Sequence, residues 1–246
     1  MALNQNDDPS RTGGAETLTE QAYRSLRADI IRGERKPGER LRIEKLKAIY
    51  GIGPTPIREA LQKLSIERLV LAQENRGFSV APLDLADFAD LNFARIEIEK
   101  VALRRSIELG DSAWEARVVA ASYLMAKADA QLEQGHGATD AWERMNAEFH
   151  LAMVGACQSR WLLITRQNLQ DMCERYRRSS MHSGRFTGGE HHEIAQAVLA
   201  RDADRACALT EAHFMATFDT LSDAPAQPAA AATTSSSHPR AEAHQP

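Results

Sequence analysis

The sequence predicts a mainly α-helical protein in two parts, an N-terminal winged helix-turn-helix and a C-terminal bundle of six or seven helices. Its length of 246 residues is about twice the commonest size of a single domain. Apolar residues recur at helical spacing through most of the chain. Residues 69–80 differ, because two short apolar runs flank a polar turn there, which is typical of a β-hairpin.

The first two helices of the N-terminal part are expected over residues 18–32 and 43–50. Their apolar residues recur every three or four positions. Gly51 follows the second helix directly. Glycine readily adopts the left-handed conformation that ends many helices, so we expect this helix to end at Gly51.

A third helix is expected over residues 53–67, followed by wing strands over 69–72 and 77–80. Pro54 and Pro56 are tolerated at the start of this helix, because first-turn N–H groups have no partner within a helix. Three helices and a two-stranded wing in this order are typical of a DNA-binding head that inserts its last helix into the major groove.

The rest of the chain is expected to be helical between two disordered ends. We place the DNA-binding domain at 17–82 and the helical domain at 83–221. Segments 1–16 and 222–246 have too little apolar surface to offset the entropy of ordering them, and are expected to be a disordered arm and tail. The helices are predicted near residues 84–109, 112–134, 139–157, 159–181, 187–200 and 203–220.

Charge and cysteine content narrow the class of protein. Residues 17–82 contain 13 Lys and Arg against 8 Asp and Glu, whereas residues 83–246 contain 16 against 23, so the first part is the one suited to approach a polyanion. The chain has neither an 18-residue apolar run nor the apolar core of a secretion signal. Three cysteines without a CxxC pair fit a reducing cytoplasm, and the protein is expected to be cytoplasmic.

The candidate DNA-contacting residues lie on the third helix and the wing. Thr55 and Arg58 are near the start of that helix, and Lys63 is more than a turn further on. Arg76 and Gly77 form the wing tip, where glycine allows the backbone to approach a groove closely. An ordinary solvated surface charge is the alternative for Arg58.

The N-terminal part resembles the GntR family of transcriptional regulators. The resemblance spans about residues 18–82 and rests on Gly33–Leu41, on Pro56–Leu61 (Pro-Ile-Arg-Glu-Ala-Leu) and on the segments 67–70 and 76–80. It implies operator DNA as partner and contacts from Thr55, Arg58 and Arg76. In two places the chain departs from the family pattern: the usual Ser-Arg-Thr-Pro turn is Gly-Pro-Thr-Pro, and Glu44 stands where arginine is common.

Three histidines of the helical part are expected to converge. Asp202 is the midpoint between His191 and His213 and also lies in the turn between the last two helices. Antiparallel helices joined by a short loop bring equidistant residues to one level, and both histidines lie on inward apolar stripes. His150 lies one turn after Asn146 on a third helix. Such a set suits Zn²⁺ or Ni²⁺, although a single inward histidine is more often a hydrogen-bonded core residue.

The helical part resembles the FCD effector domain of the FadR branch of that family, over about residues 84–220. The resemblance implies a divalent metal held by Asn146, His150, His191 and His213, with Asn146 where the family usually has Asp, so that the site can be weaker or empty. It also implies a homodimer and a small carboxylate effector. Residues 155–159 and 175–177 are similar to the group of carbon-starvation-induced regulators.

Arg95 and Tyr176 are the candidate effector-binding residues. A guanidinium group matches a carboxylate in a bidentate manner, and an ion pair of Arg95 with Glu99 is the alternative. The sequence therefore predicts a DNA-binding regulator, most often a repressor in such a design, that is not an enzyme. The alternatives are a helical metal-dependent hydrolase using Glu148 or Glu190 as a base, with an accessory DNA-binding domain, and a ligand-independent architectural DNA binder.

Overall fold

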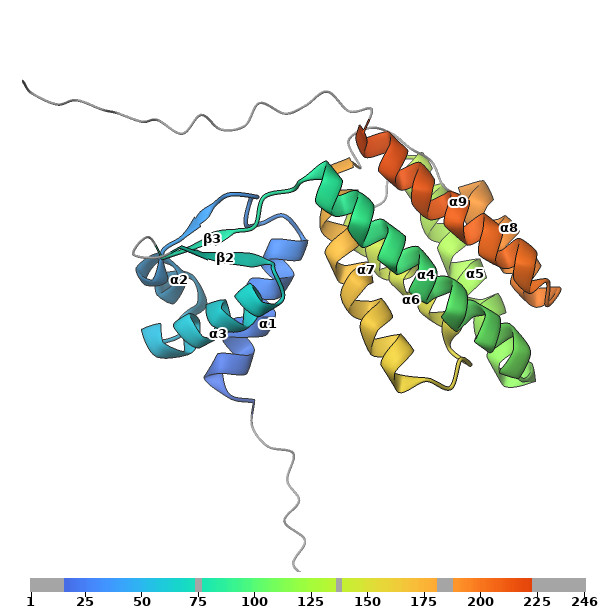
Figure 1. Cartoon of the computed structure of the whole chain (residues 1–246), viewed down its shortest axis with the longest axis horizontal. Helices are drawn as coiled ribbons and strands as arrows, with labels where there is room; N and C mark the ends of the chain where they lie inside the picture. Colours follow the sequence, from blue (N-terminus) through green and yellow to red (C-terminus); the bar gives the residue numbers. More distant parts are fainter. Residues whose placement is uncertain (1–15, 74–76, 136–138, 181–187, 223–246) are drawn as a thin grey trace, which may run out of the picture.

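A computed structural model describes residues 16–73, 77–135, 139–180 and 188–222, and shows a small head beside a larger helical bundle (Figure 1). The head contains α1 (Leu18–Ile31), β1 (Arg40–Leu41), α2 (Ile43–Tyr50), α3 (Pro54–Ile66), β2 (Val70–Gln73) and β3 (Gly77–Val80). The bundle contains α4 (Leu85–Leu109), α5 (Ser112–Glu133), α6 (Thr139–Val154), α7 (Arg160–Ser180), α8 (Gly188–Leu199) and α9 (Ala203–Ser222). The expected mainly helical fold is confirmed.

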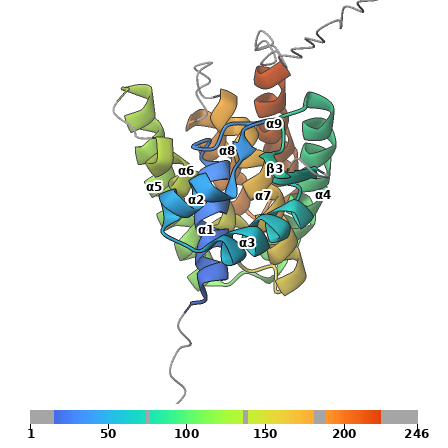
Figure 2. The same ribbon diagram turned by 90° about the vertical axis from the view of Figure 1, so that its left-hand side faces the viewer.

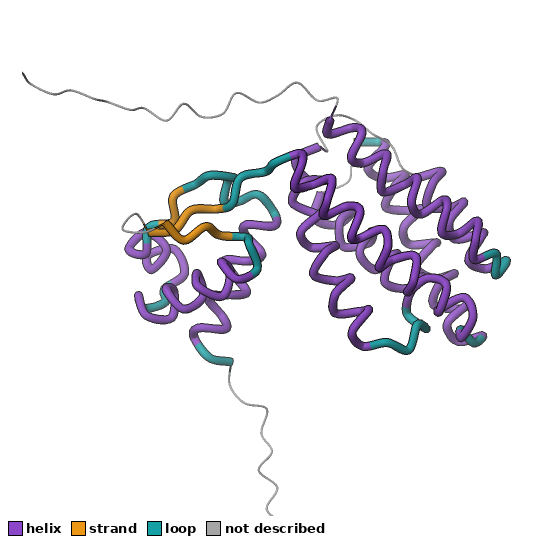
Figure 3. The backbone as a smooth tube through the Cα atoms, viewed as in Figure 1, coloured by secondary structure: helices purple, strands orange, loops and turns teal. Residues whose placement is uncertain are grey.

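The strands lie in the head alone among the described residues, as Figure 3 shows. They form an antiparallel sheet in the order β1-β3-β2, in which Val70 is opposite Val80 and Arg40 is opposite Ser79. The expected two-stranded wing therefore carries a third, two-residue strand that the sequence pattern did not predict. The predicted wing residue Arg76, His136, His182, the arm before Glu16 and the tail after Ser222 lie outside the described residues.

The head is built around an apolar core that fixes the outward face of α3. Ile57, Ala60, Leu61 and Leu64 of α3 are buried against α1, α2 and the sheet. Gly51 ends α2 in the left-handed conformation with φ 66°, as predicted from its position. The opposite face of α3 is left exposed, and Figure 2 shows the head, with α1, α2 and α3, in front of the bundle.

The helices of the bundle bury two apolar clusters together with polar residues such as Arg95, Glu99 and His150. Trp114, Phe149, Val154 and Val198 are among the buried residues of the larger cluster. Asp84 and Asp111 cap α4 and α5 by accepting hydrogen bonds from backbone N–H groups, which explains why these helices begin close to their predicted starts. None of the described helices is long and apolar enough to cross a membrane.

Candidate metal centre and nucleic-acid interface

The three predicted histidines meet inside the bundle. His150 comes from α6, His191 from α8 and His213 from α9, and all three are buried. One ligand atom from each lies within 4.8 Å of the others, and the ring centroids of His191 and His213 are 4.7 Å apart. The convergence that the Asp202 midpoint predicted is therefore present.

Carboxylates orient two of these rings. Asp129 Oδ2 is 2.9 Å from Nδ1 of His191, and the other oxygen of Asp129 accepts a hydrogen bond from Trp142 Nε1 at 2.7 Å. Glu190 Oε2 is 2.6 Å from Nδ1 of His213. A metal-binding histidine usually donates its second ring N–H to such a carboxylate, which fixes the tautomer and directs Nε2 toward the metal.

Unsatisfied buried atoms support the fit of this site to a metal. Nε2 of His150 and Nε2 of His191 have no hydrogen-bond partner within the described part of the chain, and neither has Oδ1 of Asn146, one turn before His150. Burial lowers the pKa of His150 well below its ordinary value, with the charge of His213 as the next cause. The ring is therefore neutral at physiological pH, which is the form that binds metal ions.

The two glutamates considered as a general base are not placed for that role. Glu148 is exposed on α6, next to the buried Phe149. Glu190 is engaged with His213 through Nδ1, the side of the ring away from the expected ligand atom. Neither glutamate therefore faces the histidine cluster as the general base that the hydrolase alternative requires.

Arg95 lies next to the histidines and lacks partners for part of its guanidinium. It is buried 3.6 Å above the ring of Phe214, which in turn lies beside His150 and His213. Its Nε and Nη2 have no hydrogen-bond partner among the described residues, and burial lowers the pKa of the group. The proposed alternative, an ion pair with Glu99, is not the arrangement observed, because Glu99 pairs with another arginine.

That arginine is Arg166 of α7, which the sequence pattern did not single out. Its side chain is fully buried, and its Nε is 2.8 Å from Glu99 Oε2, but neither this nitrogen nor Nη1 and Nη2 makes a hydrogen bond to any of the described residues. Arg95 and Arg166 are thus both buried, and the ion pair with Glu99 is made by Arg166. An unpaired buried charge is costly, so this region is suited to an anionic ligand. Arg166 and Gln170 lie one turn apart on the buried stripe of α7, a signal that sequence inspection can use.

Tyr176 lies elsewhere. Its ring stacks on Phe88 with centroids 4.3 Å apart, and its hydroxyl donates to Asp87 Oδ2 at 3.0 Å. Burial and this hydrogen bond raise its pKa to about 12. The structure does not bring Tyr176 to the histidine cluster, because it belongs to a separate small core with Phe88 and Cys173.

The outward face of α3 carries the predicted DNA-contacting residues of the head. Thr55 and Arg58 are exposed on it, and Gln62 is exposed one turn after Arg58. Lys63 instead faces α1, where its Nζ is 3.2 Å from Glu20 Oε2 and 5.6 Å from the ring of Tyr23. Gly77 begins β3 with φ 84°, a conformation that L-residues rarely adopt.

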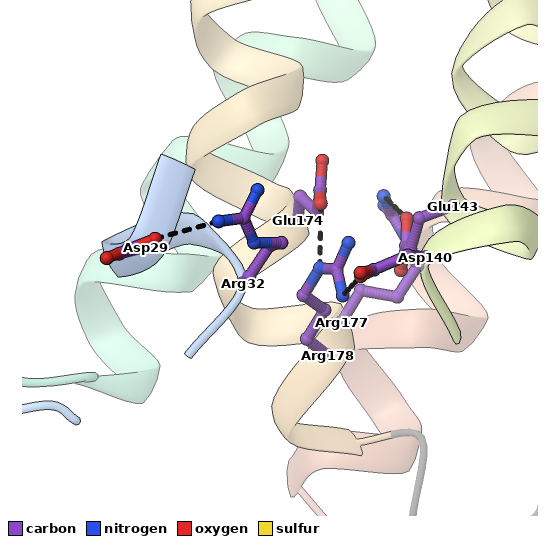
Figure 4. A network of polar contacts seen from close by, with 7 residues as sticks. All are labelled: Asp29, Arg32, Asp140, Glu143, Glu174, Arg177 and Arg178. Atoms are coloured by element: carbon purple, nitrogen blue, oxygen red, sulfur yellow. Dashed lines mark hydrogen bonds and ion pairs between the residues drawn. The ribbon is translucent and has the colours of Figure 1, made fainter. Parts of the chain in front are cut away.

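Polar contacts join the head to α7 of the bundle. Arg27 of α1 donates to Glu67 at 2.9 Å and to Asp171 of α7 at 2.8 Å. Arg175 donates to the carbonyl of Ala81 at 2.8 Å, and Met172 packs against the core of the head. Side chains of α1, α6 and α7 line a cleft of about 480 Å³ here. Figure 4 shows charged groups in and beside it, including the pairs Arg178–Glu174 and Arg177–Glu143.

Comparisons with known proteins agree with this architecture. The family model described as bacterial regulatory proteins, gntR family, matches residues 18–80, and the FCD domain model matches residues 90–216. The chain is 38% identical to the uncharacterized HTH-type transcriptional regulator BphR of Paraburkholderia xenovorans, over 83% of this chain and 85% of that protein. It is 36% identical to the HTH-type transcriptional repressor GlaR of Escherichia coli, over 78% of this chain and 90% of that protein.

Solved structures show the same fold. McbR/YncC of E. coli superposes with a TM-score of 0.71 at 19% identity, covering 85% of this chain and 98% of that chain. A putative transcriptional regulator GntR from Rhodococcus sp. RHA1 superposes with a TM-score of 0.69 at 23% identity, covering 85% and 99%.

Proposed function

Because the chain belongs to the GntR family of bacterial regulatory proteins and carries an FCD domain, we propose that it is a homodimeric repressor whose operator binding responds to a small carboxylic acid. It is a DNA-binding transcriptional regulator, and its FCD domain is a small-molecule effector domain. The repressor assignment is supported by the name of its E. coli relative GlaR. The class of effector, the metal and the dimer are the parts proposed.

The observation that carries the effector class is the excess of buried positive charge beside the histidines. Arg95 and Arg166 are both buried, yet Glu99 is the one carboxylate that an ion pair brings to them among the described residues. A carboxylate accepts two parallel hydrogen bonds from a guanidinium and supplies the missing charge. The ligand is thus an acid small enough to fit between α4, α6 and α7.

A divalent metal is the second anchor of this proposal. His150, His191 and His213 would hold it, with Asn146 as a weaker oxygen ligand. When bound, the metal supplies a Lewis-acid contact for an oxygen of the effector. Its role is to position the ligand and not to catalyse a reaction, in keeping with the regulator names of the relatives and with the positions of Glu148 and Glu190.

Helix α7 is the element that would carry the signal to the head. Its inward face bears Arg166 and Gln170, and its outward face bears Asp171, Met172 and Arg175, which contact the head. An acid that pairs with Arg166 would therefore change the position of α7, the helix that contacts the head. Switching requires that the acid binds the DNA-bound and DNA-free arrangements with different affinities.

The DNA-binding step is proposed to use the exposed face of α3. Thr55 and Arg58 would contact the major groove, Gly77 with Arg76 would reach an adjacent groove, and Lys63 would contact the backbone from the flank. Two heads of a homodimer would then bind half-sites about one helical turn apart. A purely architectural DNA binder leaves the unsatisfied polar interior of the bundle without a purpose.

A two-stage experiment tests this function. The purified full chain selects duplexes from a random-sequence pool, and organic acids are then screened for a rise in melting temperature with and without Zn²⁺ and Ni²⁺. We expect selected duplexes to contain a palindrome, and an acid that stabilises the protein to change its affinity for that duplex. If no duplex is selected, the proposal that the protein binds operator DNA is contradicted. If none of the acids changes the affinity for the selected duplex, the proposal of a carboxylic acid effector is contradicted.

A further inference from the structure

The atoms of the described residues that could bind a metal ion inside the bundle carry no negative charge. Each of the three clustered histidines offers a ring nitrogen, and Asn146 offers an amide oxygen one turn before His150. The carboxylate of Asp129 contacts Nδ1 of His191, so its charge acts on a metal ion only through that ring. A divalent ion would therefore enter a set of ligand atoms that leaves both of its charges uncompensated.

Two guanidinium groups add positive charge beside the histidines. Arg95 of α4 and Arg166 of α7 are both buried, and the ion pair with Glu99 is made by Arg166. Their charges reach the cluster: burial and the charge of His213 lower the pKa of His150 most, and both guanidinium groups lower it further. Like charges repel strongly where water is excluded, so these groups oppose a metal ion at the histidines.

Arg95 is placed to bind the same anion as the metal ion would. Its guanidinium lies 3.6 Å from the centre of the Phe214 ring, and the centre of that ring is 5.2 Å from the ring of His150 and 5.5 Å from the ring of His213. Nε and Nη2 of Arg95 are buried without a hydrogen-bond partner among the described residues. A carboxylate can therefore bind this guanidinium without displacing a contact of either nitrogen.

We propose that Asn146 makes metal binding and acid binding depend on each other, so that the bundle responds to the two ligands as a pair. The inference rests on the acid and the metal of the proposed function and assigns the regulation of that site. The carboxylate of the acid supplies the negative charge that the amide of Asn146 does not, and it offsets the charge of the metal ion and of Arg95 together. Each ligand therefore raises the affinity for the other.

The coupling can be measured from either side. The factor by which the acid changes the affinity for the metal must equal the factor by which the metal changes the affinity for the acid. Coupling between two binding sites is typically about 5- to 150-fold, and tenfold or more is expected here because the groups involved are buried. A full response of the head, transmitted through α7, then requires both ligands.

Zinc titrations in different anions test the coupling. The metal-free full chain is titrated at free Zn²⁺ concentrations fixed by a metal buffer, in chloride alone and with acetate or succinate at equal ionic strength. One ion binds in chloride through the histidines, and we expect at least one of the two acids to tighten that binding about tenfold or more. Zn²⁺ should tighten the binding of the same acid by the same factor. Equal affinity for Zn²⁺ in chloride, acetate and succinate would overturn the inference.

The variant Asn146→Asp supplies the missing charge from the chain itself. In chloride it should bind Zn²⁺ about tenfold or more tightly than the unmodified chain, and the acids should then change its affinity less than about threefold. A gain of affinity cannot result from misfolding. Asn168→Asp makes the same chemical change on the exposed face of α7 and should keep both the affinity and the acid effect. An Asn146→Asp variant that binds no more tightly and keeps the full acid effect would overturn the inference.

The variant Arg95→Gln separates the coupling from a structural role of Arg95. Removing this charge should leave the affinity for Zn²⁺ in chloride equal or higher, because a repulsion is lost, and should abolish the effect of the acids. A merely structural arginine would instead weaken Zn²⁺ binding in every anion. An acid effect of undiminished size in Arg95→Gln would contradict the inference.

The outcomes separate this inference from the proposed function. If the acids tighten Zn²⁺ binding but leave the affinity for the selected duplex unchanged, the coupling stands and the effector proposal fails. If an acid changes DNA affinity equally with and without Zn²⁺, the regulator stands and the coupling is overturned. If Zn²⁺ binds in none of the three anions, the coupling is overturned whatever the DNA affinity.

Discussion

The head and the bundle bury different kinds of residue. In the described part of the head, the residues that are buried are apolar, among them Leu26, Leu46, Ile57 and Leu61. The bundle buries Arg95, Glu99, Asn146, Arg166 and the three histidines together with its apolar core. Polar groups are buried at a cost unless they find partners, so their confinement to the bundle marks where a ligand is expected.

This difference follows from the two kinds of partner. DNA is a large polyanion that a protein meets with exposed side chains, and α3 presents Thr55 and Arg58 to solvent over a core that only supports them. A small acid must be surrounded and desolvated before a few contacts can hold it. The head is therefore expected to lose function through surface changes, and the bundle through changes to its interior.

The largest expected effect is a loss of stability when the buried ion pair between Glu99 and Arg166 is broken. Glu99→Ala leaves the buried Arg166 without its carboxylate partner, and the free energy of unfolding should fall by about 3–5 kcal/mol. Arg104 and Asp204 form an exposed pair at 2.7 Å, so Asp204→Ala should cost no more than about 1 kcal/mol. Urea denaturation of the ligand-free protein measures both. If both variants lose equally little unfolding free energy, unpaired charge in the interior does not destabilise the bundle.

On the head, the expected effect is on DNA affinity and not on stability. Arg58→Ala should weaken binding to the selected duplex by about 1–3 kcal/mol while the unfolding free energy stays unchanged. Lys63→Ala is the matched variant, and a smaller loss is expected because Glu20 already holds that ammonium group. A gel-shift titration at fixed salt compares the two. If Arg58→Ala binds the duplex as tightly as the unmodified protein does, α3 is not the helix that contacts the DNA bases.

Metal affinity should depend on a residue that does not contact the metal. Asp129→Asn keeps the shape of the side chain but removes the charge that orients His191, so Zn²⁺ affinity should fall about 10- to 100-fold. Isothermal titration calorimetry of the metal-free chain measures this. Asp204→Asn, on the exposed start of α9, is the control that should bind Zn²⁺ normally. Unaltered affinity of the Asp129 variant would mean that the ring of His191 needs no such support.

The smallest expected effect is at the contact between the two regions. A double-mutant cycle of Arg27→Gln and Asp171→Asn should give a coupling energy of about 0.2–1 kcal/mol, since both side chains are partly exposed. The same variants should reduce the change in DNA affinity that an effector produces. A coupling energy of zero, with a full effector response, would exclude this pair from the connection between head and bundle.

The helices and the histidine cluster could be predicted because their signals are local or periodic. Caps such as Gly51 and Asp111 fix helix ends, and the spacing of His191 and His213 about Asp202 follows from helix geometry. The two-residue strand β1 has no period to detect. It forms because β3 offers it an edge, which is a tertiary effect.

The partners of the site residues could not be predicted, because they come from other helices. Asp129 orients His191 across 62 positions of sequence, and Glu99, the alternative partner suggested for Arg95, pairs instead with Arg166. Asp129 does follow the buried Met125 by one turn, so a polar residue on an apolar stripe was the available signal. Tyr176 was assigned by its neighbours in sequence, whereas its position on α7 turns it toward Phe88.

Titration of Zn²⁺ into the metal-free chain and two histidine variants tests the central claim, that the interior of the bundle is the ligand site. The account predicts one tightly bound ion per chain for the unmodified protein. The same result is expected for His192→Ala, since His192 is exposed and its ring bonds to Gln196. Binding should be strongly weakened in His191→Ala, because the neighbouring His191 is buried in the cluster. Absence of binding to the unmodified chain, or equal losses in the two variants, would contradict it.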